Sequence, residues 1–196
     1  MPDVREQIYN LISEVDPFDK QEAQDIATIH EWIKSDEGIY RDGDQPNEKR
    51  HLCCYLALVD LGNEKVLLGK HIKSGRILPT GGHCDPGEMP SDTVKRESSE
   101  ELGIDNPIIL SKNGGPFFVS LIDTVGPTGG HQHADNWFLI VGDSTQQVPQ
   151  TDESDREFEG GLQWWKFEQI LETNEGLLGI GLHRFVRKLI AKREKE

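Results

Sequence analysis

The stretch Gly81–Ile104, GGHCDPGEMPSDTVKRESSEELGI, contains a glycine pair, a turn and a short charged helix. The turn is predicted at Asp85-Pro86-Gly87, whose residue types suit a tight reversal of the chain. Ser91 is a candidate N-cap, and Gly103 tolerates the left-handed backbone found at helix C-termini. We therefore expect a loop followed by a helix that stops at Gly103.

The predicted helix presents Glu97, Glu100 and Glu101 on one side, because they are three and four residues apart. Carboxylates gathered in this way repel each other unless positive charge lies nearby. Mg²⁺ prefers oxygen ligands, usually one or two carboxylates together with waters and substrate phosphates. The pattern therefore favours a divalent-metal site, although a solvated acidic helix face is the ordinary alternative.

The same stretch resembles the Nudix box, a motif of widely spaced glycine and charged positions. The matched positions, all at the expected spacing, are Gly82, Glu88, Arg96-Glu97, Glu100-Glu101 and Gly103-Ile104. Ser98 departs from the family pattern, which usually has an apolar residue there, and it is expected to face the sheet. The resemblance implies an α/β fold, namely a Nudix-like α/β/α sandwich with a mixed β-sheet.

The resemblance also implies roles for the matched residues. The implied catalytic residues in the box are Arg96, Glu100 and Glu101. The implied metal ligands are Glu97, Glu100, Glu101 and a main-chain carbonyl of the glycine pair, assigned to Gly82. Arg96 would orient a carboxylate through a forked ion pair, and Glu88, grouped with the substrate-binding residues, would brace the loop. The implied cofactor is Mg²⁺, with Mn²⁺ as the alternative.

The implied reaction is hydrolysis of a diphosphate linkage in a nucleoside diphosphate linked to another moiety, by attack of water on phosphorus. The box does not specify the general base. The run Arg156-Glu157-Phe158 resembles a family pattern that supplies one, so Glu157 is preferred and Glu159 is the next candidate. An acidic surface loop is the alternative interpretation of this region.

Substrate contacts are expected from basic and imidazole side chains outside the box. Arg50 and Arg76 precede the box and are the preferred phosphate-binding residues. His133 belongs to the run 131–135, HQHAD, in which alternate residues share one face of a strand and could contact phosphate or a metal. A zinc site that includes His83 and Cys84 is a further alternative, although the spacing carries no zinc signature.

Composition limits the class of protein. The formal net charge of −14 argues against binding of a nucleic acid duplex, and the apolar runs are too short to span a membrane. Three cysteines without CxxC spacing indicate reduced thiols. These features predict a cytoplasmic protein with no membrane partner, and the resemblance implies a small nucleotide-like substrate.

Two parts are predicted along the chain, an N-terminal helical extension over residues 1–45 and a Nudix-like catalytic domain over 46–196. The extension should form two helices separated at Pro17. Their apolar stripes would pack on the core or on a second subunit in a homodimer, or the pair would act as a lid. The catalytic domain should contain strands at 51–61, 65–71, 107–110, 116–125, 136–141 and 161–167, an acidic loop at 143–159, and helices at 168–173 and 183–195.

Two other functions remain open at this point. A catalytically idle Nudix-fold domain would bind a nucleotide or a protein, but the box carboxylates that such a domain loses are all present. Isomerisation of an isoprenoid diphosphate on the same scaffold would need a cysteine and a glutamate facing the substrate, which Cys84 and the box do not exclude.

Overall fold

The computed structural model describes residues 3–41, 49–111, 113–124, 130–148 and 151–194. Its helices are α1 (Val4–Ser13), α2 (Lys20–Ile33), α3 (Pro90–Leu102), α4 (Asp152–Glu157), α5 (Phe167–Glu172), a 3₁₀ turn (Glu175–Leu177) and α6 (Leu182–Arg193). Its strands are β1 (Arg50–Asp60), β2 (Lys65–His71), β3 (Ile77–Leu78), β4 (Thr80–His83), β5 (Phe118–Asp123), β6 (Gln132–Val141) and β7 (Phe158–Lys166). None of the helices in these ranges is long and apolar enough to cross a membrane.

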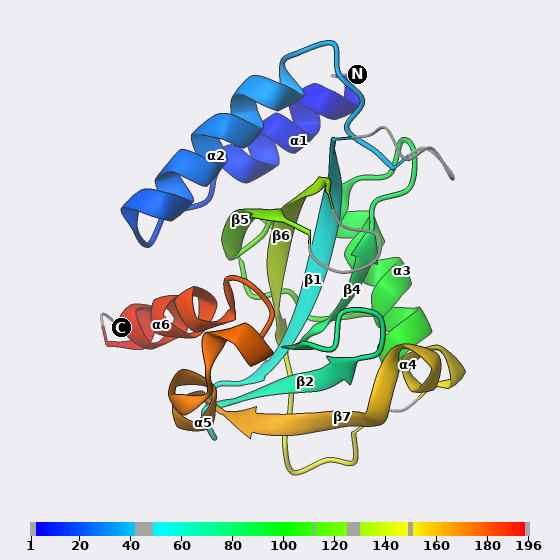
Figure 1. Cartoon of the computed structure of the whole chain (residues 1–196), viewed down its shortest axis with the longest axis vertical. Coiled ribbons are helices and arrows are strands. Elements are labelled where there is room, and N and C mark those ends of the chain that lie inside the picture. Colours follow the sequence, from blue (N-terminus) through cyan, green and yellow to red (C-terminus); the bar gives the residue numbers. More distant parts are fainter. Residues whose placement is uncertain (1–2, 42–48, 112, 125–129, 149–150, 195–196) are drawn as a thin grey trace.

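A mixed sheet of seven strands within the described residues forms the middle of the molecule (Figure 1). Its main path is β3-β2-β1-β6-β5, while β4 pairs with β1 and β7 pairs with β2. The central strand β1 runs parallel to β6 and antiparallel to β2 and β4. Because β1 is covered on both faces, almost every one of its residues is buried, which explains its nearly continuous apolar sequence.

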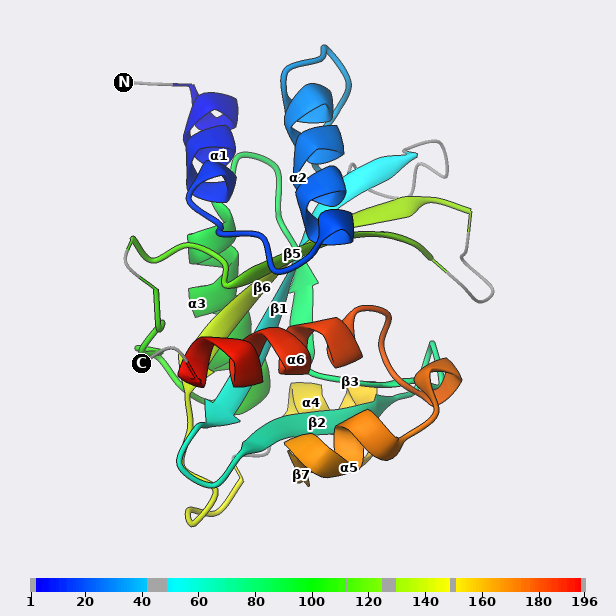
Figure 2. The same ribbon diagram turned by 90° about the vertical axis from the view of Figure 1, so that its left-hand side faces the viewer.

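Helices cover both faces of this sheet (Figures 1 and 2). On one face, Val94 and Leu102 of α3 share a buried cluster with Leu56 of β1. On the other face, Phe185 of α6 packs against Trp137 of β6, with ring centroids 5.3 Å apart. The predicted α/β/α sandwich with a mixed sheet is therefore confirmed.

The box helix begins two residues earlier than predicted. Met89, not Ser91, is the N-cap, and Pro90 is the first helical residue. Proline suits this position because the first backbone N–H groups of a helix have no partner within the helix. The C-terminus is as predicted, since Gly103 adopts a left-handed conformation with φ 63°.

The acidic loop predicted at 143–159 is wrong over residues 152–157, which are helical. Helix α4 forms there because Thr151 and Ser154 make a reciprocal capping box at its N-terminus. The strand predicted at 107–110 is reduced to an isolated bridge between Ile109 and Ile140. The first of these differences places Glu157 on the last turn of a helix.

The N-terminal helices pack on the chain's own core. Ile8, Ile12 and Ile29 belong to the buried cluster that contains Leu52 of β1 and Phe138 of β6. The structure therefore shows packing of these helices on the core of the same chain, which was one of the predicted arrangements. The boundary at 45/46 falls outside the described residues, so the division into two parts stays a prediction, as does a homodimer.

A buried ion pair connects α2 to α6 and β5. Lys188 Nζ lies 2.7 Å from Glu22 Oε1, and both side chains are almost fully inaccessible to solvent. The same Glu22 oxygen accepts a hydrogen bond from the Val119 N–H at 3.1 Å. Each buried charge therefore depends on the other for compensation.

Replacing Lys188 with alanine should lower the free energy of unfolding by about 3–5 kcal/mol, because Glu22 would stay buried without its counter-charge. Urea denaturation followed by circular dichroism measures this loss. The control is Lys192→Ala, which removes an exposed pair with Asp16 and should cost less than about 1 kcal/mol. Equal small losses in both variants would contradict the structural role of the buried pair.

Candidate active site

The glycine pair of β4 lets α3 lie unusually close to the sheet. The Gly81 N–H donates a hydrogen bond to Glu101 Oε2 at 2.7 Å. A Cβ atom at Gly82 would overlap the carboxylate of Glu97, and one at Gly81 would overlap the backbone oxygen of Cys54. Glycine is therefore required at Gly81, where a side chain would meet backbone, whereas a side chain at Gly82 would displace the Glu97 carboxylate.

Arg96 organises the acidic side of α3. Its guanidinium forms a two-pronged contact with Glu88, with both N···O distances at 3.1 Å. It also donates to Glu97 at 2.7 Å, to Glu100 at 3.1 Å and to the backbone carbonyl of His83 at 3.1 Å. One planar cation thus holds three carboxylates and the end of β4 in a fixed arrangement.

The three box glutamates differ in their environments, which helical spacing alone does not indicate. Glu101 is buried, Glu97 is largely covered and the Glu100 side chain is half exposed. Burial raises the pKa of Glu101 to about 8, and the nearby charge of Glu97 adds to this effect. Burial also raises the pKa of Glu97, against the opposing effect of Arg96. Additional positive charge at this site would therefore stabilise the ionised carboxylates.

The donor set fits a hard divalent cation. Carboxylate oxygens of Glu97, Glu100 and Glu101 are ligands of the kind that Mg²⁺ and Mn²⁺ take. The half-exposed Glu100 leaves one side of the group open to solvent. The metal-binding roles of these residues and of Gly82 remain predictions.

Glu157 and Glu159, the two candidates for the general base, have different surroundings. Glu157 is three-quarters covered and lies 3.7 Å from His71 Nε2 and 3.4 Å from Lys73 Nζ. Its charge contributes to the raised pKa of Glu97 and of Glu101, so it lies near the box carboxylates. Glu159 is exposed and pairs with Lys70. The structure thus brings Glu157, and not Glu159, toward the box.

The predicted substrate-binding arginines outside the box are held by partners other than the box carboxylates. Arg50 donates two hydrogen bonds to Gln132 Oε1, at 3.0 and 2.6 Å. Arg76 donates to the backbone carbonyl of Leu178 at 2.9 Å, which fixes one end of its guanidinium. Their substrate contacts, and that of His133, remain predictions.

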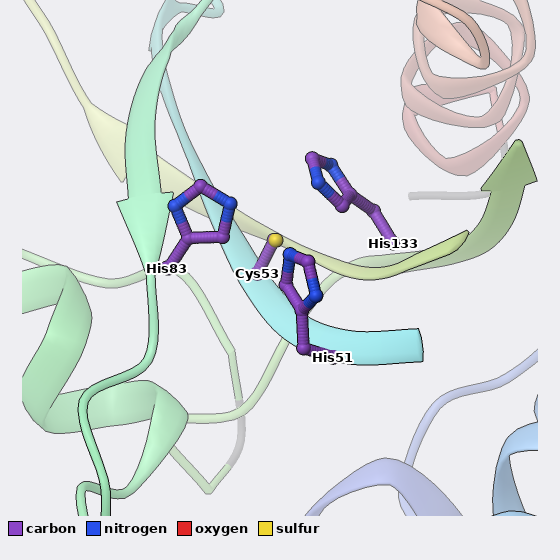
Figure 3. Close-up of side chains that lie close together, drawn as sticks. All are labelled: His51, Cys53, His83 and His133. Atoms are coloured by element: carbon purple, nitrogen blue, oxygen red, sulfur yellow. The ribbon is translucent and has the colours of Figure 1, made fainter. Parts of the chain in front are cut away.

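His133 belongs to a group of side chains that sequence inspection did not assemble. We call His51, Cys53, His83 and His133 the histidine–cysteine cluster; Figure 3 shows the four side chains converging from neighbouring strands. The zinc alternative combined His83 with Cys84, but Cys84 is not in this cluster, because its Sγ contacts Cys54 Sγ at 3.6 Å on the opposite face of β1. The overlooked signal was the alternation of His51 and Cys53 on a buried strand.

Comparison with solved structures gives matches that cover most of this chain. A hydrolase of the Nudix family from Clostridium perfringens is 24% identical with a TM-score of 0.55, over 73% of this chain and 98% of that one. A C. elegans Ap4A hydrolase is 17% identical with a TM-score of 0.55, over 74% and 98%. The E. coli dihydroneopterin triphosphate pyrophosphohydrolase is 12% identical with a TM-score of 0.54, over 79% and 99%. At these identities the likeness establishes the fold.

The family itself is established from sequence. A search of curated proteins gives no match. The family model described as NUDIX domain matches residues 49–181, which include all seven strands of the described sheet, the box helix and the segment that carries Glu157. The chain therefore belongs to the Nudix family, whose hydrolases act on phosphoric anhydride bonds.

Proposed function

We propose that this protein is a metal-dependent pyrophosphohydrolase that cleaves a diphosphate linkage in a nucleoside diphosphate linked to another moiety. The observation that carries the proposal is the placement of carboxylates at the glycine pair. Glu101 is buried against the Gly81 N–H, and Glu97 and Glu100 are held beside it by Arg96. Burial of such a group of carboxylates is costly unless a cation compensates for their charge. The arrangement therefore favours a metal-binding role over a purely structural one.

Mg²⁺ or Mn²⁺ would be held by Glu97, Glu100 and Glu101, with the Gly82 carbonyl as a further candidate. When bound, the metal supplies charge neutralisation for phosphate oxygens. Arg96 keeps the carboxylates oriented, and Glu88 fixes Arg96 through its two-pronged contact. The Gly81 N–H holds one oxygen of Glu101, so the other oxygen keeps a defined direction.

Glu157 is our proposed general base, which accepts the proton of the attacking water at a carboxylate oxygen. The His71 imidazole, 3.7 Å away, lowers the pKa of Glu157, and the charge of Lys73 acts in the same direction. The group is therefore ionised at neutral pH and available as a proton acceptor. Its position at the end of α4 is supported by the Thr151 hydroxyl, which donates to the Glu101 carbonyl at 3.2 Å.

A nucleotide-like substrate is supported by two structural neighbours, an Ap4A hydrolase and a dihydroneopterin triphosphate pyrophosphohydrolase. Arg50, Arg76 and His133 remain the proposed contacts to the rest of such a substrate. Isoprenoid-diphosphate isomerisation is less well supported, because Cys84 is buried against Cys54 and cannot face a substrate. A cytoplasmic setting and the absence of duplex and membrane partners stay predictions.

The test of the proposed function is turnover by box variants. Purified protein with Mg²⁺ or Mn²⁺ is first assayed against nucleoside triphosphates, nucleotide sugars, ADP-ribose and dinucleoside polyphosphates. With the best substrate, Glu100→Gln and Glu101→Gln should each lower kcat at least about 100-fold, because a metal supplies several kcal/mol of transition-state stabilisation. Glu168→Gln, an exposed change on α5, is the control and should keep wild-type turnover. Full activity in both box variants would refute the metal role.

The assignment of Glu157 as general base is tested by a matched pair of variants, one at Glu157 and one at the nearby Glu159. Glu157→Gln should lower kcat by about 100-fold or more while metal binding is retained, because only the proton acceptor is lost. Glu159→Gln should stay within about twofold of wild type, since Glu159 is exposed and pairs with Lys70. Single-turnover kinetics at saturating metal separates the two variants. A larger loss in Glu159→Gln would assign the base to that residue instead.

The raised pKa of Glu101 predicts how stability depends on pH in the presence of a chelator. Its folded-state pKa of about 8 exceeds the ordinary value of 4.5, so its contribution to stability is present below pH 4.5 and is lost as pH rises toward 8. One pKa unit corresponds to about 1.4 kcal/mol. Metal-free wild type should therefore lose several kcal/mol more than Glu101→Gln between these pH values.

Urea denaturation of both proteins across that range measures the difference. Saturating Mg²⁺ should reduce it, because the cation favours the ionised carboxylate. If the free energy of unfolding changes with pH in the same way in both metal-free proteins, Glu101 is not buried as the structure describes.

A further inference from the structure

The histidine–cysteine cluster is built into the sheet and does not depend on loops. His51 and Cys53 are two residues apart on β1, so their side chains share one face. In the sheet register, Cys53 pairs with His83 of β4 and His51 pairs with His133 of β6. Paired residues of adjacent strands point to the same face, so three neighbouring strands deliver four ligand-type side chains to one place (Figure 3).

The four side chains are close enough to share one ion. One nitrogen from each histidine and the Cys53 sulfur all lie within 4.8 Å of one another. In a tetrahedral zinc site the corresponding separations are about 3.4 Å between nitrogens and about 3.6 Å between nitrogen and sulfur. Small side-chain movements, of about 1 Å, would therefore convert the cluster into a tetrahedral site.

His51 supplies independent evidence for a ligand. Its side chain is buried, with 3% relative exposure, and neither Nδ1 nor Nε2 has a hydrogen-bond partner among the described residues. Its ring lies 4.8 Å from that of His83 and 4.7 Å from that of His133, measured between centroids. An unsatisfied buried polar group costs about 1–3 kcal/mol. A cation at the centre of the cluster would accept a lone pair from this ring and remove part of that cost.

We propose that His51, Cys53, His83 and His133 bind one transition-metal ion of the zinc class, at a site separate from the box carboxylates. Three imidazoles and a thiolate favour such an ion over Mg²⁺, which prefers oxygen. Four protein ligands leave no open position for substrate, so the site is structural. On binding, the Cys53 S–H bond is replaced by a sulfur–metal bond and the proton passes to solvent.

The proposed ion would also stabilise the end of β4, which contacts Arg96. The backbone carbonyl of His83 accepts a hydrogen bond from Arg96, and His83 directly follows the glycine pair. Asp135, fully buried and paired in register with Cys53, lies 3.9 Å from His133 Nδ1 and can support that ring. As a ligand of this ion, His133 would no longer serve as the substrate contact named for it above, and His51 and Cys53 are themselves buried away from any substrate.

Cobalt binding tests the proposal without an activity assay. Wild-type protein is stripped with a chelator under reducing conditions and titrated with Co²⁺ while the visible and near-ultraviolet spectrum is recorded. We expect one equivalent to produce a thiolate-to-cobalt charge-transfer band, which Zn²⁺ abolishes by competition and excess Mg²⁺ does not. Failure of this band to appear in folded wild-type protein would overturn the proposal.

Matched cysteine variants locate the ion. Cys53→Ala should lose the charge-transfer band, whereas Cys84→Ala should keep it, because Cys84 packs with Cys54 on the other face of β1. His51→Ala should weaken cobalt binding by at least about 100-fold, more than the loss of a residue that only supports a ligand. A band that persists in Cys53→Ala or disappears in folded Cys84→Ala would refute this ligand set.

A second measurement covers the case in which a buried variant fails to fold. X-ray absorption spectroscopy of zinc-loaded wild type should show one sulfur and three nitrogen neighbours, and a shell of oxygen atoms alone would refute the proposal. Glu100→Gln should keep the cobalt band, because its carboxylate belongs to the Arg96 group. A loss of hydrolase activity in that variant thus leaves the test of the cluster unaffected.

Discussion

The close approach of α3 to β4 is the constraint on which the site depends. Glutamate side chains of α3 reach the backbone of β4 because neither Gly81 nor Gly82 carries a Cβ atom. The approach buries carboxylates, and Arg96 compensates for this by contacting the acids of α3 and the end of β4 together. A helix that presented the same acids to solvent would bind metal more weakly, because water would screen the charges.

Much of this region could be predicted from the sequence, because its signals are local. Helix length, the stop at Gly103 and the grouping of Glu97 with Glu100 follow from residue types and helical spacing. The unequal burial of the three glutamates could not be predicted, since it depends on which side of α3 faces β4. The helix begins two residues earlier than predicted because Pro90 is itself a favourable first residue of a helix.

Long-range pairing explains what sequence inspection missed. His51 and His133 are far apart in the chain and become neighbours through the parallel register of β1 with β6, which residue spacing does not indicate. The ion pair of Glu22 with Lys188 likewise joins an N-terminal helix to the last helix. Helix α4 was obscured by its acidic composition, although Thr151 and Ser154 carried the capping signal. The histidine–cysteine cluster and the buried ion pair therefore both depend on contacts between segments that are distant in the sequence.

Product analysis in water enriched in heavy oxygen tests the central claim, metal-dependent attack of water on phosphorus, most directly. A substrate that contains a diphosphate linkage is turned over with Mg²⁺, and the products are examined by phosphorus NMR and mass spectrometry. The account predicts two products with new phosphate termini, one of which carries a single heavy oxygen on phosphorus, and no reaction in the presence of a chelator. Products without heavy oxygen, or an isomer with its diphosphate intact, would contradict it.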